Sequence, residues 1–164
     1  DLGDYGDVEN PWVIYDGQLF KMWYTKETGQ PYEHQIHFAT SLDGVSWTPQ
    51  GVVLDMGVPG SWDDGAVFWP AVIFNGTTYK MWYGGHARSP PYRGSFGYAT
   101  SSEGIHWTKY EANPVLSPGG NGGWDDWSIA SPPKSDLQRN TLHNVVQCAG
   151  STLRPYKDGC CHLC

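Results

Sequence analysis

Residues 13–24 read VIYDGQLFKMWY, and residues 72–83, 59 positions later, read VIFNGTTYKMWY. A second pair of segments matches in the same order, with ATSLDGVSWT at 39–48 and ATSSEGIHWT at 99–108. The tripeptide Trp-Asp-Asp also occurs twice, at 62–64 and at 124–126. A fixed period of this length indicates a repeat protein, whose units bury their apolar faces only against one another. The number of repeats therefore decides which fold the chain forms.

Each repeat predicts four short antiparallel strands. The first two strands are expected at 11–15 and 20–25 in one copy and at 70–74 and 79–84 in the other. Asp16-Gly17 and Asn75-Gly76 separate them, and such dipeptides favour two-residue hairpin turns because they tolerate positive φ. Third strands are expected at 34–40 and 95–100, and fourth strands around Trp47 and Trp107. No segment has helical periodicity of useful length.

A repeated four-stranded antiparallel unit is typical of a β-propeller blade. We expect an all-β chain with an opening segment and first blade at 1–65, a second blade at 66–127 and a partial third blade at 128–164. Propellers need about four or more blades to close, so about two and a half blades form an incomplete propeller. Its open edges leave backbone groups unpaired. We predict that a homodimer completes the ring, with a tetramer as the alternative.

The repeat pattern stops near residue 134, and all four cysteines lie beyond it, within 148–164. Shifted by one nucleotide, codons for residues 142–147 can give Tyr-Thr-Met-Trp-Tyr-Ser, the missing second strand of a third blade. We therefore predict that the tail is out of frame, which the nucleotide sequence tests. The spacing within Cys148, Cys160, Cys161, His162 and Cys164 fits no common zinc motif. We expect no metal and no cofactor.

Composition excludes several kinds of partner. The 164 residues are in the range of one domain, and 39% hydrophobic residues, with 15% aromatic, are enough to form a core. A net charge of −7 makes nucleic acid and anionic membranes unsuitable partners. No apolar run approaches the roughly 20 residues that span a bilayer, and no signal peptide is recognised at Asp1. We expect a soluble chain and assign it no compartment.

The second copy, from Trp62-Asp63-Asp64 through 70–85 to 97–109, resembles the five-bladed β-propeller glycosidases. The resemblance covers residues 4–133 and points to glycoside hydrolase families 43 and 32 and their unclassified relatives. It implies hydrolysis of an oligosaccharide by carboxylates on separate blades, about 5–5.5 Å apart for retention of configuration or about 6.5–9.5 Å for inversion. Family 43 enzymes often place acids beside the proline of the innermost strand. Here the flanking residues are Asn10, Trp12, Trp69, Ala71, Ser131 and Pro133, and none is an acid.

In such propellers, the loop before the innermost strand and the loop between the second and third strands form the face that binds ligands. The resemblance therefore implies a site of acids and aromatic rings at this face. The candidate catalytic residues are Glu9, Asp64 and Asp126. The candidate substrate-binding residues are Asp7, Asp63, Trp69, His86, Arg88, Tyr92 and Arg93.

Structural interpretations stand beside these functional ones. Asp63-Asp64 and Asp125-Asp126 occur in both copies, as a structural turn would. The tryptophans that repeat with the blades are expected to pack between blades, and three histidines are expected on strand surfaces. These are Trp23, Trp47, Trp82 and Trp107, and His34, His37 and His106. The predicted function is a glycoside hydrolase-like site formed on assembly, and the alternative is a non-catalytic carbohydrate-binding or structural fragment.

Overall fold

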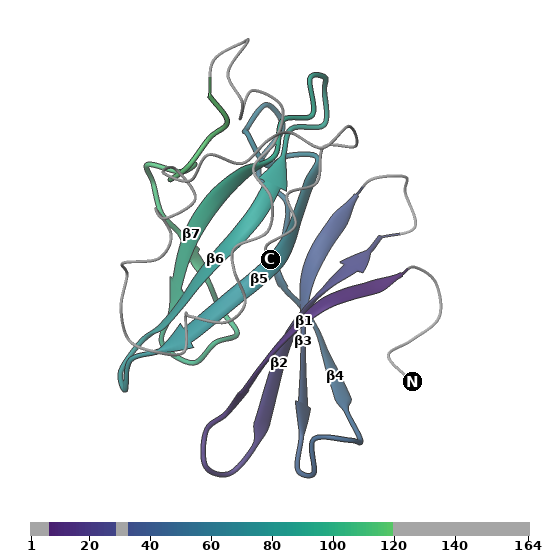
Figure 1. The fold of residues 1–164 in the computed structure, drawn as a ribbon, viewed down its shortest axis with the longest axis vertical. Helices are drawn as coiled ribbons and strands as arrows, with labels where there is room; N and C mark the ends of the chain where they lie inside the picture. The colour runs from purple at the N-terminus through teal and green to yellow at the C-terminus, as the bar shows by residue number, and fades with distance from the viewer. Residues whose placement is uncertain (1–6, 29–32, 120–164) are drawn as a thin grey trace, which may run out of the picture.

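The computed structural model describes residues 7–28 and 33–119, which Figure 1 draws in colour. β1 (Val8–Tyr15), β2 (Phe20–Glu27), β3 (His34–Ser41) and β4 (Thr48–Leu54) form one antiparallel sheet in chain order. β5 (Ala66–Phe74), β6 (Tyr79–His86), β7 (Ser95–Ser101) and β8 (Thr108–Lys109) form a second. The predicted all-β organisation in four-stranded units is confirmed. The expected third blade at 128–164 and its tail lie outside the described residues.

These described segments contain no helix, so none of them supplies a helix that is long and apolar enough to cross a membrane.

The two hairpins predicted from the repeat have the same turn chemistry. Gly17 and Gly76 have φ of +96° and +97°, values that glycine adopts without steric strain. Asp16 Oδ1 accepts hydrogen bonds from the backbone N–H groups two and three residues further on, at 3.0 and 2.8 Å. Asn75 Oδ1 does the same at 3.1 and 2.9 Å. Local side-chain bonds of this kind end one strand and begin the next.

The fourth strands differ from the prediction. β4 begins at Thr48, after Trp47, because the carboxylate of Asp43 binds the backbone N–H groups of residues 45 and 46 and so extends the turn. β8 has only two residues, and a bridge between Phe96 and Leu116 continues the edge of the second sheet. The fourth strands are therefore not centred on the tryptophans.

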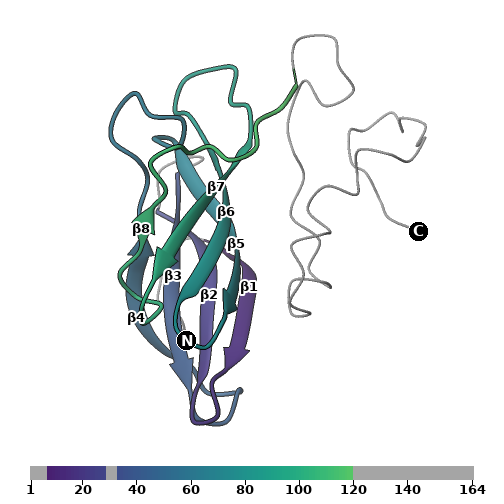
Figure 2. The ribbon, with the colours of Figure 1, turned by 90° about the vertical axis from the view of Figure 1, so that its left-hand side faces the viewer.

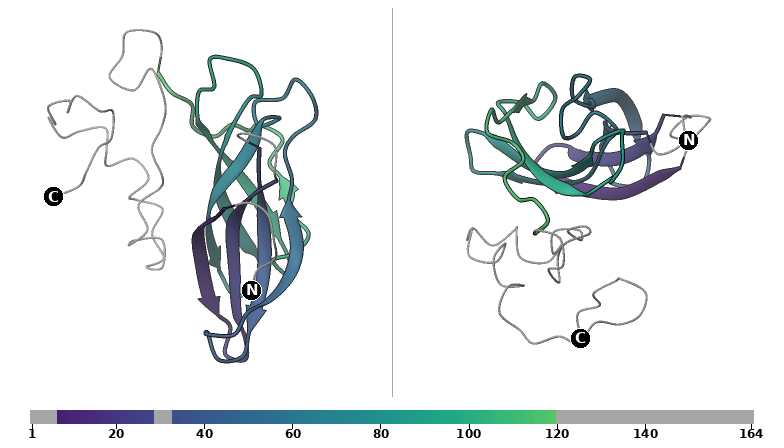
Figure 3. Two further views of the ribbon diagram at one scale, coloured as in Figure 1. Left: turned by 90° about the vertical axis from the view of Figure 1, so that its right-hand side faces the viewer. Right: turned by 90° about the horizontal axis from the view of Figure 1, so that it is seen from above.

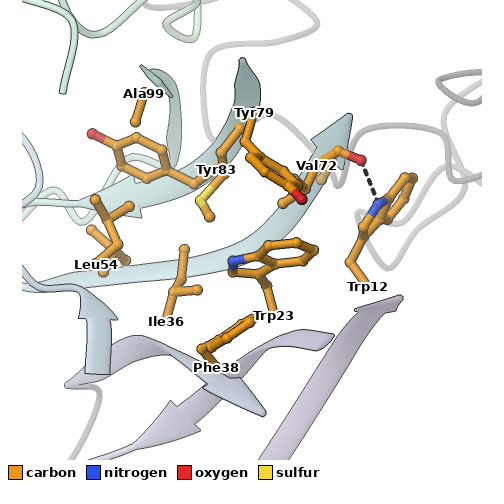
Figure 4. Close-up of a cluster of buried hydrophobic side chains, with 12 residues drawn as sticks. Trp12, Trp23, Ile36, Phe38, Leu54, Val72, Tyr79, Tyr83 and Ala99 are labelled. Atoms are coloured by element: carbon orange, nitrogen blue, oxygen red, sulfur yellow. Dashed lines mark hydrogen bonds between the residues drawn. The ribbon is translucent and has the colours of Figure 1, made fainter. Parts of the chain in front are cut away.

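The two sheets pack against each other through one hydrophobic core. β5, the first strand of the second sheet, lies against β1, β2 and β3, and Figures 2 and 3 show the sheets side by side along their length. In Figure 4, Trp23, Ile36 and Phe38 from the first sheet face Tyr79 and Tyr83 from the second. Trp23 is fully buried, with 0% of its surface exposed. Burial of such large rings supplies most of the attraction between the sheets.

Hydrogen bonds fix the relative position of the sheets. Trp12 Nε1 donates to the carbonyl oxygen of Val72 at 2.6 Å, as Figure 4 shows, and Trp23 Nε1 donates to the carbonyl oxygen of Gly104 at 2.7 Å. A side chain at position 104 would place its Cβ 2.8 Å from the Trp23 ring. The expectation of packing between blades is met by Trp23 and by Trp107, which packs against the same core.

The first strand of each sheet is interrupted at the same place. The pairing of β1 with β2 shifts between Glu9 and Trp12, and the pairing of β5 with β6 shifts between Phe68 and Ala71. The residue before each proline is left-handed, with φ of +48° at Asn10 and +54° at Trp69. Such a conformation is rare for bulky residues and persists only where surrounding contacts hold it.

Candidate functional site

One end of the molecule combines the segments that carry the candidate residues. The starts of β1 and β5 pair with the ends of β2 and β6, and the loops 55–65 and 87–94 project from the same end, at the top of Figure 2. The N–H of Gly65 donates to the carbonyl oxygen of His86 at 3.0 Å and ties the first loop to β6. Among residues 7–28 and 33–119, the opposite end has only the hairpin turns. The described candidates therefore lie towards this end of the molecule.

A cluster of rings at this end centres on Phe68. Its ring lies 4.8 Å from that of Trp69, 5.8 Å from His86 and 6.4 Å from His34, between centroids. Tyr92 extends the cluster, 6.0 Å from His86, and is 55% exposed. We call these five residues the aromatic shelf. It spans both sheets, because His34 begins β3 and the others belong to the second sheet or its loop.

Two features of the sequence hold the shelf in place. A Cβ at Gly84 would lie 2.5 Å from the Phe68 ring, so only glycine leaves room for that ring. The corresponding residue of the first repeat is Thr25, whose Oγ1 accepts a hydrogen bond from the backbone N–H of Trp69 at 2.9 Å. Thr25 is 1% exposed. The first sheet thereby binds the backbone of Trp69, whose left-handed conformation is shared by Asn10 in the first copy.

Arg88 connects the two loops beside the shelf. Its backbone N–H donates to Asp64 Oδ1 at 2.7 Å, and its guanidinium forms an ion pair with Glu33. Asp64 Oδ2 accepts the N–H of Gly60 at 2.7 Å. Asp64 and Arg88 line a hollow of about 180 Å³ between the loops. The hollow is small for a ligand site.

The electrostatics of Asp64 restrict its chemistry. Hydrogen bonds from the backbone N–H groups of Arg88 and Gly60 hold the pKa of its carboxyl below the usual value. A carboxylate that stays ionised is unsuited to the general-acid step of glycoside hydrolysis but suits a base or nucleophile. Its two bonds also join loop 55–65 to loop 87–94. Its catalytic role stays a prediction, and its geometry is that of a loop anchor.

Asp63 points into the protein, with 2% of its surface exposed. Lys109 Nζ donates to Asp63 Oδ2 at 2.7 Å, the hydroxyl of Tyr83 donates to the same oxygen at 3.2 Å, and Ser61 Oγ donates to Oδ1 at 3.0 Å. Burial and the charge of Asp63 raise the pKa of the Tyr83 hydroxyl. A buried carboxylate paired in this way stabilises the loop, and it does not reach the surface where a substrate would lie.

The remaining candidates, Asp7, Glu9, Arg93 and Asp126, belong neither to the five shelf residues nor to the Asp63–Asp64 pair. Asp7 and Glu9 are exposed at the start of the first sheet, where Glu9 pairs with Thr25 in the β1–β2 ladder. Glu9 Oε2 accepts a hydrogen bond from Asn10 Nδ2 at 3.3 Å. Arg93 is half-buried in the loop that carries Tyr92. Asp126 lies outside the described residues.

The sequence prediction did not include three members of the site. Phe68 and Glu33 are not among the candidates, and His34 is expected on a strand surface. A usable signal was the pair Gly84-Gly85, which replaces Thr25-Lys26 at the end of the second strand. Glycine in a strand often marks a place where another group approaches closely. That group is the ring of Phe68.

Across residues 7–28 and 33–119, no cluster of three or more His, Cys, Asp or Glu side chains could hold a metal ion.

Sequence comparisons find relatives without a described activity. No family model matches the chain. The uncharacterized proteins MT1551 and Rv1502, from two strains of Mycobacterium tuberculosis, are both 37% identical to it over 112 residues. The match covers 65% of this chain and 36% of each relative. The chain thus spans about a third of the length of these relatives.

Structural comparisons define the class of fold. A protein described as a glycoside hydrolase superposes with a TM-score of 0.62 at 19% identity, covering 78% of this chain and 43% of that one. Zg3597, a family 117 glycoside hydrolase of Zobellia galactanivorans, gives 0.61 at 18% identity, covering 77% and 43%. A glycosyl hydrolase from Bacteroides ovatus gives 0.54 at 21%, covering 63% and 31%. The chain therefore has an incomplete, propeller-like glycosidase fold that corresponds to less than half of these proteins.

Proposed function

We propose that this chain binds oligosaccharide on the aromatic shelf, as part of a glycoside hydrolase-like site that is completed on assembly. The observation that carries the proposal is the ring cluster of Phe68 and the left-handed Trp69, which Thr25 of the other sheet binds, at the end where the glycosidase-like fold gathers its loops. Strained residues held by neighbouring contacts gather at functional sites. A bulky ring in that conformation, half-buried at the surface, has no role in the core.

The shelf has the chemistry that sugars require. Sugar rings present apolar C–H faces, which pack on aromatic rings, and hydroxyl groups, which need donors and acceptors. Phe68, Trp69 and Tyr92 supply the ring faces. His86 Nδ1 lies 2.9 Å from the carbonyl oxygen of Ala87, so in the neutral tautomer that donates to this oxygen Nε2 is an acceptor. The Arg88–Glu33 ion pair adds a positive and a negative group beside the shelf.

Catalysis requires a general acid and a second carboxylate. Glu9 is the described candidate whose carboxylate is exposed and bound only by its neighbour Asn10. Asp64 is held by two backbone N–H groups, and Asp63 is buried. We therefore assign oligosaccharide binding to this chain alone and hydrolysis to an assembly in which Glu9 is paired with a carboxylate from elsewhere. The non-catalytic alternative is favoured by the absence of acids beside Pro11 and Pro70.

Assembly is part of the proposal. The described residues form two four-stranded sheets, and the structural relatives are more than twice as long as the matched part. A homodimer is the simplest assembly that adds blades symmetrically, and a tetramer is the alternative. Light scattering measures this directly, and a stable monomer of 18.2 kDa would contradict it.

Binding is tested with an oligosaccharide panel and matched variants. A structural neighbour with a TM-score of 0.53 at 22% identity is described as targeting β-1,2 mannosidic linkages in Candida mannan, so manno-oligosaccharides belong in the panel beside plant-derived ones. We expect Tyr92→Ala and His86→Ala to weaken binding about tenfold each, equal to about 1.4 kcal/mol. His106→Ala at the opposite end is the control, because this side chain is 90% exposed and bonds only within its turn. Unchanged affinity in both shelf variants would refute the site.

Hydrolysis is tested separately with a panel of nitrophenyl glycosides. We expect Glu9→Gln to abolish any activity of the assembled protein, because the amide cannot exchange a proton or act as a nucleophile. Asp64→Asn tests the anchor interpretation. The asparagine side chain keeps one oxygen that can accept a backbone N–H, so this variant should mainly loosen loops 55–65 and 87–94. Full activity in Glu9→Gln would clear that residue of a catalytic role.

A further inference from the structure

The two sheets contact each other through different faces. Because each sheet is a copy of the other, each also has an equivalent of the face that the other uses. The first sheet contributes Trp23 and Phe38 to the interface between the sheets, and the second contributes Met81 and Tyr83. Because the sheets are copies, the outer side of the first sheet carries the equivalents of Met81 and Tyr83. The outer side of the second sheet carries the equivalents of Trp23 and Phe38. We call these the first-sheet outer face (Val8, Val13, Tyr15, Phe20, Met22, Tyr24) and the second-sheet outer face (Lys80, Trp82, Tyr98, Tyr110).

Exposure of equivalent residues shows that the first-sheet outer face is incompletely covered. Val8 is 42% exposed, whereas its counterpart Val67, which faces the first sheet, is 0% exposed. Val13 is 38% exposed, and its counterpart Val72 is 1% exposed. Valine at these two positions is therefore buried only in the second copy, where the first sheet packs on it. Met22 and Tyr24 of the first-sheet outer face are buried, at 6% and 1% exposed.

The second-sheet outer face shows the converse. Trp23 is 0% exposed and Phe38 is 2% exposed, because the second sheet covers them. Their counterparts Trp82 and Tyr98 are half-buried and contact each other, with ring centroids 5.2 Å apart. Tyr110 lies beside Tyr98 and is 49% exposed. Aromatic rings of this size on one surface mark an interaction site.

One hydrogen bond between the sheets also has an equivalent between two docked copies. Trp23 Nε1 donates to the carbonyl oxygen of Gly104, a left-handed glycine with φ of +87°. The counterpart of Gly104 is Gly44, which is also left-handed, with φ of +75°. The counterpart of Trp23 is Trp82. A sheet docked on the first-sheet outer face in the observed manner would therefore bring Trp82 Nε1 to the carbonyl oxygen of Gly44.

Charge supports the same pairing. Lys21 Nζ lies over the Tyr79 ring, 5.1 Å from its centroid. The counterparts are Lys80 and Phe20, so a docked copy would place the ammonium of Lys80 over a phenyl face. The contacts between Lys21 and the Tyr79 hydroxyl, and between Thr25 and Trp69, have no equivalent, because the counterparts lack the hydroxyl groups. The repeated interface is therefore weaker than the internal one.

We propose that the second-sheet outer face of one chain docks onto the first-sheet outer face of a second copy, head to tail. The contact reproduces the packing between the two sheets of one chain, with Trp82 in the place of Trp23. Contacts of this kind join unlike surfaces, so they close into a ring or extend into a longer assembly. The inference rests on the assembly included in the proposed function and names the two surfaces that form it.

Complementation tests this pairing. Val13→Asp places a charge in the first-sheet outer face and should prevent docking there. Trp82→Asp does the same in the second-sheet outer face. Val45→Asp is the matched control, because Val45 is 82% exposed in a hairpin turn. Under reducing conditions, light scattering should show each single variant as an 18.2 kDa monomer and the control with the wild-type mass. An equimolar mixture of the two variants should form a one-to-one dimer, since each retains the face that the other lacks.

Several results would overturn the proposal. They are a monomeric wild type, a single variant that keeps the wild-type mass, and a mixture that stays monomeric. Circular dichroism establishes that each variant is folded, and where Trp82→Asp fails to fold, Tyr110→Asp replaces it at an exposed position of the same face. Oligosaccharide binding by Tyr92→Ala is measured independently. Single variants that keep the wild-type mass, together with intact oligosaccharide binding, refute this pairing alone, and assembly without binding refutes the proposed function alone.

Discussion

Thr25→Val tests the contact on which the shelf depends. The substitution keeps the shape of the side chain and removes the oxygen that accepts the N–H of Trp69 at 2.9 Å. Thr25 is 1% exposed, so water cannot replace that oxygen without opening the contact between the sheets. An unsatisfied donor in such a place costs about 1–3 kcal/mol, and the added methyl recovers part of it. We expect the free energy of unfolding to fall by about 1–2 kcal/mol.

The same change should act on binding. The left-handed conformation of Trp69 costs about 1–3 kcal/mol by itself and persists because its surroundings hold it. Without the Thr25 bond, the strand can relax and move the Trp69 ring away from Phe68. We expect oligosaccharide affinity to fall about tenfold, equal to about 1.4 kcal/mol.

Urea unfolding followed by circular dichroism measures the first effect, and calorimetric titration with the best oligosaccharide of the panel measures the second. Thr48→Val is the control, because Thr48 lies exposed in β4 of the same sheet and should change stability by less than about 0.5 kcal/mol. An unchanged unfolding free energy in Thr25→Val would refute the anchoring argument. Lower stability with unchanged affinity would separate Trp69 from the site.

Two further predictions use the repeat as its own control. Gly104→Ala should destabilise the protein more than Gly44→Ala, by about 1–3 kcal/mol in urea unfolding. Both glycines are left-handed, but a Cβ at 104 lies 2.8 Å from Trp23 and a Cβ at 44 has no neighbour closer than 3.5 Å, so equal effects would contradict this account of the packing. Asp16 has its pKa lowered to about 2 by backbone hydrogen bonds, so its contribution to stability is complete above about pH 4 and is lost as pH falls towards about 2. Asp16→Asn should reduce that acid sensitivity and Asn75→Asp should introduce it, and parallel pH profiles for both variants and wild type would refute the assignment.

The hairpins and the four-stranded units were predictable because their determinants are local. The turn at Asp16-Gly17 depends on a carboxylate that binds the next backbone N–H groups and on a glycine that accepts positive φ. Asn75-Gly76 carries the same chemistry. Turns of this kind set strand pairing and register without information from the rest of the chain, and two copies of the pattern predict two sheets.

The fate of the two adjacent aspartates was not predictable in the same way. Asp63 and Asp64 are identical in type and differ by one position, yet one is buried and the other faces the loops. The difference depends on Lys109, 46 residues further along, which supplies the charge that makes burial of Asp63 tolerable. Partners at that separation are brought together only by the tertiary fold.

The repeat also explains where function can lie in this fold. Positions at which both copies have the same residue type, such as Met22 and Met81, follow the needs of packing, because every blade meets its neighbours alike. A site needs something that one copy has and the other lacks. Gly84 in place of Thr25 is such a difference: the glycine makes room for Phe68 in one sheet, and the threonine holds Trp69 from the other. The shelf is therefore built from the positions at which the two copies diverge, and exchange of residues 25 and 84 between the repeats should abolish it while the hairpins remain.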